Sequence, residues 1–285
     1  MRPPEWLKNT LVFAAILFSG NIFFRPAIVR SLKTFVAFCL ASSATYIFND
    51  LRDRQTDLTH PLKCHRPIAS GVVPTPAAQA AILIFAAVSI AIGFTVNWQT
   101  GRVVLAYLVL TTLYSLGLKH IVILDVFVIA TGFVFRVIAG SDAIGVEFSS
   151  WLVLCTFLLA LFMGFGKRRE ELLLLERNAR DHRRVLHDYS PHFLDMMMVV
   201  VSSATVVCYA LYTLDAGTIA RFGTHRLVYT SVFVLYGIFR CLYLMYEESA
   251  GGNPTILVYR DYSLQVDILF WVATIFFFRY CPKLF

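Results

Sequence analysis

The stretch Asn49-Asp50-Leu51-Arg52-Asp53-Arg54-Gln55-Thr56-Asp57 closes a long apolar segment near residues 33–50. Asn49, Asp53 and Asp57 are spaced four residues apart, and a further carboxylate, Asp50, lies in the same run. On a helix this spacing places all four polar side chains on one face. Neighbouring carboxylates repel one another unless a cation lies between them, and ligand sets made only of oxygen suit Mg2+, which often bridges to substrate phosphates. A solvated acidic helix end is the simpler alternative, but the position of the run beside an apolar segment favours a Mg2+ site.

The composition is typical of an integral membrane protein. The chain has 285 residues, of which 58% are hydrophobic and 15% are charged, and its mean hydropathy is +0.68. This is far more apolar than an ordinary soluble domain. No polar or Pro/Gly-rich linker divides the sequence, so we predict a single transmembrane domain over residues 1–285. The six cysteines are scattered without a C-x-x-C pair, which predicts neither a disulfide framework nor a zinc site.

Apolar stretches recur along the whole chain and approach the length of about 20 residues that a helix needs to cross a bilayer. They lie near residues 7–24, 33–50, 77–97, 102–118, 121–140, 149–166, 193–214, 227–246 and 264–280. We therefore expect an all-α fold, a polytopic membrane protein built as a bundle of about nine transmembrane helices.

The connecting loops indicate how the chain is oriented, because Lys and Arg are enriched in cytoplasmic loops. With the N-terminus in the cytoplasm, the cytoplasmic loops hold roughly twice as many Lys and Arg residues as the loops on the other side. We therefore expect a multi-pass protein of the cell (inner or plasma) membrane, with the aspartate motif and the active site facing the cytoplasm.

The formal net charge of +7 fits basic loops beside membrane spans, which attract anionic lipids. Nucleic-acid binding would need a solvated basic surface with stacking aromatic side chains, whereas the aromatic residues here lie mainly in apolar spans. We therefore expect membrane lipids, and no nucleic acid, as partners. The sequence leaves open whether the chain forms a homo-oligomer.

Further polar side chains lie on the predicted cytoplasmic face or inside a span. Arg66, in the loop after the motif, could hold a phosphate through its planar guanidinium group. Tyr114, Lys119 and Asp125 lie on the same predicted face, where ordinary interfacial and helix-capping roles are the alternative. Arg136 lies inside a span, where an ionisable group is costly, so it is either the partner of a buried acid or a contact for substrate.

A third charged cluster follows the sixth predicted span and includes Lys167, Arg168 and Glu171. A basic stop at the cytoplasmic end of a span is the simpler explanation. The charged run continues to Tyr189, which is typical of an amphipathic cytoplasmic helix or lid. Near the N-terminus, Lys8 could point back into the same polar region.

These motifs together resemble the UbiA-type intramembrane prenyltransferase superfamily. The resemblance rests on the aspartate motif at the end of a second span and on the Arg66-Pro67-x-x-Ser70-Gly71 loop, and it covers nearly the whole chain. It implies a helical bundle around a central cavity that opens to the cytoplasmic side and sideways to lipid, with Mg2+-bound diphosphate at its polar mouth. Three further patterns resemble the branch that makes decaprenylphosphoryl-phosphoribose: Arg2-Pro3-x-x-Trp6-x-Lys8-Asn9; Tyr114-Ser115-x-x-Leu118-Lys119 with Asp125 and Gly132-Phe133-x-x-Arg136-x-x-Ala139-Gly140; and Gly166-Lys167-Arg168-Arg169-x-Glu171-Leu172.

This branch implies transfer of a phosphoribosyl group from phosphoribosyl diphosphate to polyprenyl (decaprenyl) phosphate. Ordinary prenyltransferases often carry a second aspartate-rich motif where this chain has residues 167–171, and that difference favours the branch. The chemistry agrees, since a donor with two phosphate groups and a phosphorylated acceptor need more cations than a single prenyl diphosphate does.

The hypothesis gives each candidate residue a role. Asp50, Asp53 and Asp57 bind Mg2+, and Asn49 orients a carboxylate or the ribose. The remaining candidates are the phosphate ligands Lys8, Arg66, Lys119, Lys167 and Arg168, the sugar or metal-water contacts Tyr114 and Glu171, and the further substrate contacts Asp125, Arg136 and Tyr189. A prenyltransferase with an aromatic or tetrapyrrole acceptor is the main alternative. A transporter is a remote one, because no repeated halves are obvious and the charges cluster on one face.

Overall fold

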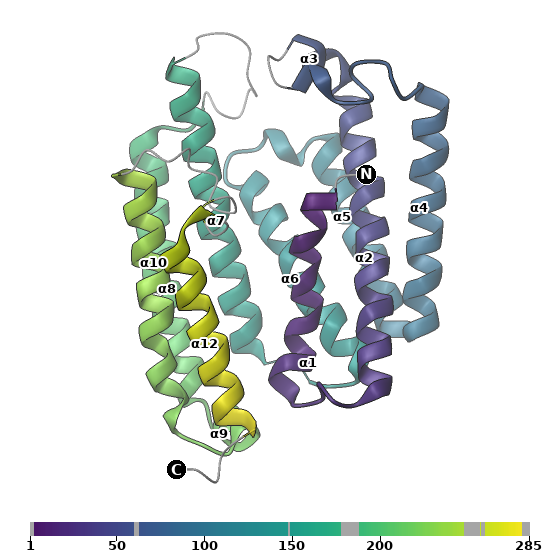
Figure 1. The fold of residues 1–285 in the computed structure, drawn as a ribbon. Helices are drawn as coiled ribbons and strands as arrows, with labels where there is room; N and C mark the ends of the chain where they lie inside the picture. The colour runs from purple at the N-terminus through teal and green to yellow at the C-terminus, as the bar shows by residue number, and fades with distance from the viewer. Residues whose placement is uncertain are drawn as a thin grey trace. The chain divides into compact units, whose positions relative to one another are not determined.

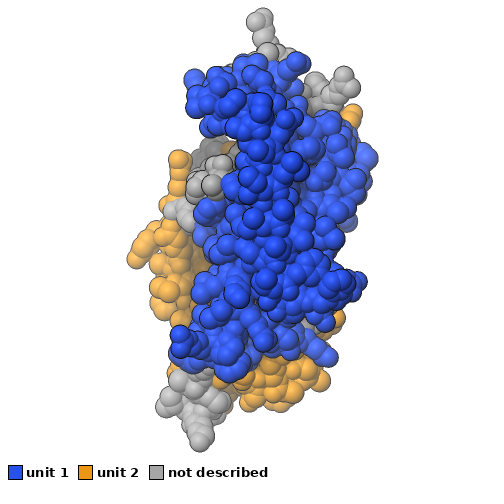
Figure 2. Space-filling view, turned by 90° about the vertical axis from the view of Figure 1, so that its right-hand side faces the viewer, with its two compact units in different colours: residues 1–148 blue, residues 149–285 orange. Residues whose placement is uncertain are grey.

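The computed structural model describes residues 3–59, 63–147, 149–177, 188–247, 257 and 260–280, and within these ranges its regular structure is entirely helical. The chain divides into two compact units, Met1–Phe148 and Ser149–Phe285, which Figure 2 shows in blue and orange. The sequence predicted one domain over 1–285, and that remains a prediction.

Unit 1 is built around the long helix α2 (Arg25–Arg52), which packs against α4 (Thr75–Val96), α5 (Trp98–Leu116) and α6 (Leu124–Ile144). Proline in the first turn of α2 and of α4 fits the start of a helix, where the missing N–H has no partner to lose. Short elements complete the unit: the 3₁₀ helices η1 (Pro3–Phe13), η2 (Lys63–His65) and η3 (Leu118–His120), and the helices α1 (Ala14–Ser19) and α3 (Arg54–Thr59). Figure 1 shows α3 at one end of α2 and the turn from α1 at the other.

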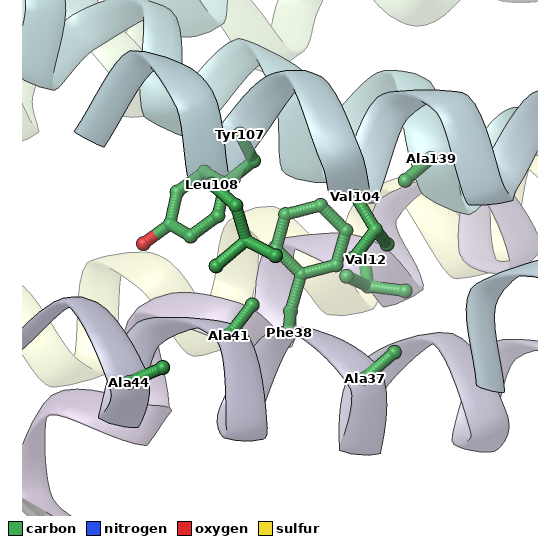
Figure 3. Close-up of a cluster of buried hydrophobic side chains, with 9 residues drawn as sticks. All are labelled: Val12, Ala37, Phe38, Ala41, Ala44, Val104, Tyr107, Leu108 and Ala139. Carbon is green, nitrogen blue, oxygen red and sulfur yellow. The ribbon is translucent and has the colours of Figure 1, made fainter. Parts of the chain in front are cut away.

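Small side chains let the helices of unit 1 approach closely. Figure 3 shows Phe38 of α2 extending toward Val104 and Leu108 of α5, and its ring lies 5.2 Å from that of Tyr107. Other members of this buried cluster are the alanines at positions 37, 41, 44 and 139. Because lipid offers no hydrophobic driving force between helices, such close van der Waals packing is what holds membrane bundles together.

Unit 2 contains α7 (Ser150–Arg177), α8 (Pro191–Leu214), α9 (Ala216–Phe222), η5 (Arg226–Thr230), α10 (Ser231–Tyr246) and α12 (Tyr262–Tyr280). α7 packs on α8, and α10 packs on α12. Asp261 lies immediately before α12 and accepts a hydrogen bond from the N–H of Leu264 at 2.8 Å. It also forms an ion pair with Arg240 of α10 at 2.7 Å. The Arg240 guanidinium lowers the pKa of the Asp261 carboxyl below its usual value.

Seven helices in the described part of the chain are long and apolar enough to cross a membrane. They are Arg25–Arg52, Thr75–Val96, Leu124–Ile144, Ser150–Leu173, Pro191–Leu214, Arg226–Tyr246 and Tyr262–Arg279. The predicted count of nine is therefore not confirmed. The stretch 7–24 divides into η1 and α1. α5 ends at Leu116, before the end of the predicted stretch 102–118, and its first turns carry the polar residues Gln99 and Arg102. The predicted central cavity and its cytoplasmic opening remain predictions.

Gly140 marks the closest approach between α6 and η1, and its substitution tests this packing. A Cβ at Gly140 would lie 2.1 Å from the backbone oxygen of Val12. A Cβ at Gly132 on the same helix would make only van der Waals contacts, the nearest of them 3.5 Å from the Tyr107 ring. We expect Gly140→Ala to reduce the free energy of unfolding by about 1–3 kcal/mol, as overpacking typically does. Gly132→Ala is the matched control. Thermal denaturation in detergent measures both, and equal melting temperatures would contradict the packing described.

Candidate functional site

The aspartate motif lies where α2 ends and α3 begins. Asp53 leaves helical geometry (φ −87°, ψ 5°) and caps α2 with its N–H bonded to the Asn49 carbonyl at 2.9 Å. The motif therefore does not lie on one continuous helix, because α2 ends at Arg52 and Asp57 belongs to α3. The N–H of Asp57 bonds the Asp53 carbonyl at 2.7 Å, which keeps the two segments together.

Arg66 connects two of the carboxylates. Its Nη1 lies 3.1 Å from Oδ1 of Asp50 and 2.7 Å from Oδ2 of Asp57. Asp50 and Asp57 are buried, with 9% and 4% of their surface exposed. A buried carboxylate is costly unless it is paired, and Arg66 supplies the partner for both acids.

A turn after Arg66 holds this residue in place. The N–H of Ser70 bonds the Arg66 carbonyl at 2.8 Å, and the N–H of Val73 bonds the Pro67 carbonyl at 2.8 Å. Gly71 adopts a left-handed conformation (φ 81°), which glycine reaches without steric cost. The loop that the sequence analysis singled out thus positions a guanidinium group beside the motif.

Lys119 pairs with the third carboxylate from the connection between α5 and α6. It belongs to η3, between α5 and α6, and only 6% of its surface is exposed. Its Nζ lies 2.5 Å from Oδ1 of Asp53 and 3.4 Å from Oδ1 of Asn49. Asn49 in turn donates to Oδ2 of Asp53 at 3.0 Å. The structure thus joins six predicted site residues into one network, which we call the aspartate cluster: Asn49, Asp50, Asp53, Asp57, Arg66 and Lys119.

The composition of the aspartate cluster can be compared with the needs of Mg2+. Among the described residues, no group of three or more His, Cys, Asp or Glu side chains is arranged to hold a metal. The carboxylates instead contact Arg66 and Lys119. Their oxygen donors nevertheless fit Mg2+, which is usually bound by one or two carboxylates together with water and substrate phosphates rather than by an all-protein cage. The cluster suits a divalent ion that arrives with a phosphorylated substrate.

Lys8 lies in a second polar group that sequence reasoning found only in part. It forms an ion pair with Glu5, and the hydroxyl of Tyr46 donates to the same carboxylate at 3.3 Å. Tyr46 is one helical turn before Asp50 on α2, so this group lies beside the aspartate cluster. Glu5 and Tyr46 were not among the residues predicted from the sequence. The available signals were the i, i+3 spacing of Glu5 and Lys8 and the i, i+4 spacing of Tyr46 and Asp50.

Arg136 is buried, and among the described residues its hydrogen-bond partners are neutral groups. Its Nε donates to Oδ1 of Asn9 at 2.7 Å, and its two terminal nitrogens donate to the Gly132 carbonyl (2.6 Å) and the Tyr107 hydroxyl (3.1 Å). The guanidinium also lies 4.9 Å from the centre of the Tyr107 ring. Within the described part of the chain, neutral oxygens and aromatic faces stabilise the charge, so the alternative of a buried acid as partner finds no support there. A role of Arg136 in substrate binding remains a prediction.

The two other candidates of unit 1 flank Lys119. Tyr114 is half-buried in the last turn of α5, and Asp125 is fully buried in the first turn of α6. A carboxylate in the first turn of a helix is stabilised by the helix dipole, and this gives Asp125 a structural role at the start of α6. Contact of either residue with substrate remains a prediction.

The candidates of unit 2 lie on α7 and just before α8. Arg168 is 2% exposed and pairs with Glu171 at 2.6 Å, while Lys167 is exposed. Tyr189 is buried, and its ring stacks on that of Phe193. Residues 178–187, the centre of the predicted amphipathic helix or lid, lie outside the described residues.

Arg169 was not predicted as a site residue, yet it connects three helices of unit 2. Its Nε lies 2.6 Å from Oδ1 of Asp195 on α8, and its guanidinium lies 4.1 Å from the centre of the Tyr246 ring on α10. The Tyr246 hydroxyl donates to the same Asp195 oxygen at 2.7 Å. This network fixes the end of α7 that carries Lys167 and Arg168.

The bridging role of Arg66 can be tested by its removal. We expect Arg66→Gln to reduce the free energy of unfolding by about 2 kcal/mol, because Asp50 and Asp57 lose their shared counter-charge. This cost is lower than for a fully buried ion pair, because a quarter of the Arg66 side chain is exposed to solvent. Arg54→Gln is the control, because exposed Arg54 contacts only Thr75 among the described residues. Chemical or thermal denaturation in detergent measures the difference, and equal stability of the two variants would refute the bridge.

The sequence and fold can now be compared with known proteins. The UbiA prenyltransferase family pattern matches residues 10–256. Decaprenyl-phosphate phosphoribosyltransferase of Mycolicibacterium smegmatis is 33% identical, over 96% of this chain and 89% of its own length. The protein of the same description from Corynebacterium glutamicum is 34% identical, over 100% of this chain and 87% of its own length. A UbiA homolog from Archaeoglobus fulgidus, solved with DMAPP and Mg2+, has a TM-score of 0.75 at 19% identity and covers 97% of this chain and 96% of its own, a likeness of fold.

Proposed function

The chain belongs to the UbiA prenyltransferase family, and from that premise we propose that it is a membrane phosphoribosyltransferase. It transfers a 5-phosphoribosyl group from phosphoribosyl diphosphate to a polyprenyl phosphate such as decaprenyl phosphate and releases diphosphate. The likeness to two decaprenyl-phosphate phosphoribosyltransferases over nearly the full length supports the choice of donor and acceptor. The observation that carries the chemistry is the aspartate cluster, in which carboxylates for a metal and cations for phosphate lie within one set of contacts.

The charges of the cluster suit a donor that carries several phosphates. Arg66 and Lys119 are at present paired with carboxylates, and both can donate to phosphate oxygens when a metal-bound diphosphate arrives. Lys8 lies beside the cluster, and we assign it and the unit 2 residues Lys167 and Arg168 to the remaining phosphates of donor and acceptor. Asn49, already bonded to Asp53, holds that carboxylate in orientation.

The reaction is a displacement at the anomeric carbon of the ribose. An oxygen of the acceptor phosphate forms the new bond to this carbon while the bond to the diphosphate oxygen breaks, so one in-line step inverts the configuration. The acceptor phosphate has a second pKa near ~6 and is largely dianionic at neutral pH, so no general base is required. Mg2+ held by Asp50, Asp53 and Asp57 would neutralise charge on the departing diphosphate. The protein's own contribution is to position and neutralise the reacting groups.

The membrane supplies the second substrate. The exposed apolar side chains on the long helices fit contact with lipid, and a polyprenyl tail would lie among them while its phosphate reaches the aspartate cluster. The proposed location is the cell membrane with the cluster on the cytoplasmic side, where a soluble phosphorylated donor is available.

A turnover assay on the purified protein tests the proposal. Labelled phosphoribosyl diphosphate, decaprenyl phosphate and Mg2+ are incubated with protein in detergent, with EDTA as control. Labelled lipid that forms only with Mg2+ is expected. Formation of a prenylated aromatic product from a polyprenyl diphosphate, with no labelled lipid, would instead establish the prenyltransferase alternative.

The metal role of the motif is tested by Asp53→Asn in the same assay. We expect turnover to fall by at least about 100-fold, because an amide removes one negative charge from the metal and phosphate site. Glu147→Gln, the same change at an exposed position of unit 1, should leave turnover intact. Both variants should insert and elute as the wild type does. Wild-type rates in Asp53→Asn would refute the metal assignment.

The role of Lys167 is tested by Lys167→Ala. The loss of one charge-assisted contact predicts a rise in KM for one of the two substrates of about tenfold at an unchanged amount of protein. Arg102→Ala removes an exposed charge from α5 and serves as the control. Unchanged KM for both substrates would show that Lys167 only helps to orient the helix in the membrane.

A further inference from the structure

A cavity of about 380 Å³ lies at the end of unit 1 that is remote from the aspartate cluster. Its lining includes Arg25, Val29, Arg30 and Lys33 on the first turns of α2, and Thr95 and Val96 at the end of α4. Arg25, Val29 and Lys33 are four residues apart and therefore share one helix face. Side chains lean toward the N-terminus of their helix, so Lys33 and Arg30 are directed toward Arg25.

The cavity has an unbalanced positive charge. No Asp or Glu lines it, and within the described part of the chain none of its three cations takes part in an ion pair. All three side chains belong to exposed residues. Three like charges around one cavity repel one another, and an anion within it would relieve that repulsion.

The position of the cavity along α2 selects the kind of anion. Arg25 and Asp50 are separated by about 38 Å along the helix axis, which exceeds the thickness of the hydrocarbon core of a bilayer, about 30 Å. When the aspartate cluster lies at one membrane surface, the cavity therefore lies at the other, at the level of lipid phosphates. Exposed apolar side chains continue from it along α2, namely Leu32 and Val36, as an acyl chain would require.

The orientation rule does not explain these charges. In the proposed orientation, Arg25, Arg30 and Lys33 lie on the side where basic residues are normally scarce. Three cations within nine residues on that side therefore need a cause other than topology.

We propose that this cavity binds the phosphate headgroup of an anionic phospholipid in the leaflet opposite the active site. The guanidinium and ammonium groups of Arg25, Arg30 and Lys33 hold the phosphodiester, and the acyl chains lie against the apolar face of α2. The site is independent of the proposed transfer reaction. Its assignment to the outer leaflet, and the argument that topology does not explain its charges, depend on the proposed orientation.

Lipid retention by the full-length protein tests the site. Wild type, Arg30→Gln/Lys33→Gln and the matched double variant Arg102→Gln/Arg221→Gln are exchanged into detergent with equal amounts of phosphatidylglycerol and phosphatidylcholine. Retained lipid is measured by native mass spectrometry. We expect wild type to prefer phosphatidylglycerol, the cavity variant to retain it about tenfold less, and the control to behave as wild type.

Two further arms make the result decisive. A charge-retaining variant, Arg30→Lys/Lys33→Arg, should keep the preference, which separates loss of charge from loss of folding. Inorganic phosphate at the lipid's concentration should leave retention unchanged, because the free ion lacks the acyl contacts. Equal retention in the cavity and control variants would overturn the proposal. Displacement of the lipid by inorganic phosphate would overturn the lipid assignment in favour of a free-phosphate site.

Discussion

The ion pairs that Arg66 makes with Asp50 and Asp57 hold together the part of unit 1 that matters for function. They join the end of α2, the short helix α3 and the loop before α4, alongside the small hydrophobic cluster in which Ile47 of α2 packs near Ile68 of the loop. Asp50 and Asp57 are nearly buried, and uncompensated charges there would destabilise the fold by several kcal/mol. Lys119 does the same for Asp53 from the connection between α5 and α6. Charge neutralisation thus shapes the polar end of an otherwise apolar bundle.

The same constraint links stability to the proposed chemistry. The aspartate cluster contains three carboxylates and two cations, and each cation contacts an acid that a metal would otherwise neutralise. In the proposed reaction, Asp50, Asp53 and Asp57 would hold the metal of a bound diphosphate, and Arg66 and Lys119 would donate to its phosphate oxygens. Such an exchange keeps the local charge balanced in both states, which a low-dielectric site demands. It also explains why a donor with many phosphates suits this site, since its charge matches both sets of groups.

The sequence was sufficient for much of this. The aspartate motif, Arg66 and Lys119 could be predicted because clustered carboxylates beside an apolar segment need nearby cations, and the structure brings these groups into contact. The break at Asp53 could not be predicted, because the spacing of the motif is compatible with a continuous helix and only the contacts of Asp57 favour the turn. The partners of Arg136 could not be predicted for a related reason. The sequence shows a buried charge, but the oxygens and rings that solvate it come from distant positions such as Asn9 and Tyr107.

The most direct test of the account is equilibrium binding of labelled phosphoribosyl diphosphate to the purified protein without acceptor. The account predicts saturable binding that requires Mg2+, is lost in the Asp50→Asn variant and persists in the presence of an equal concentration of a polyprenyl diphosphate. Loss of the labelled ligand to polyprenyl diphosphate, or binding that is indifferent to both Mg2+ and Asp50, would contradict it.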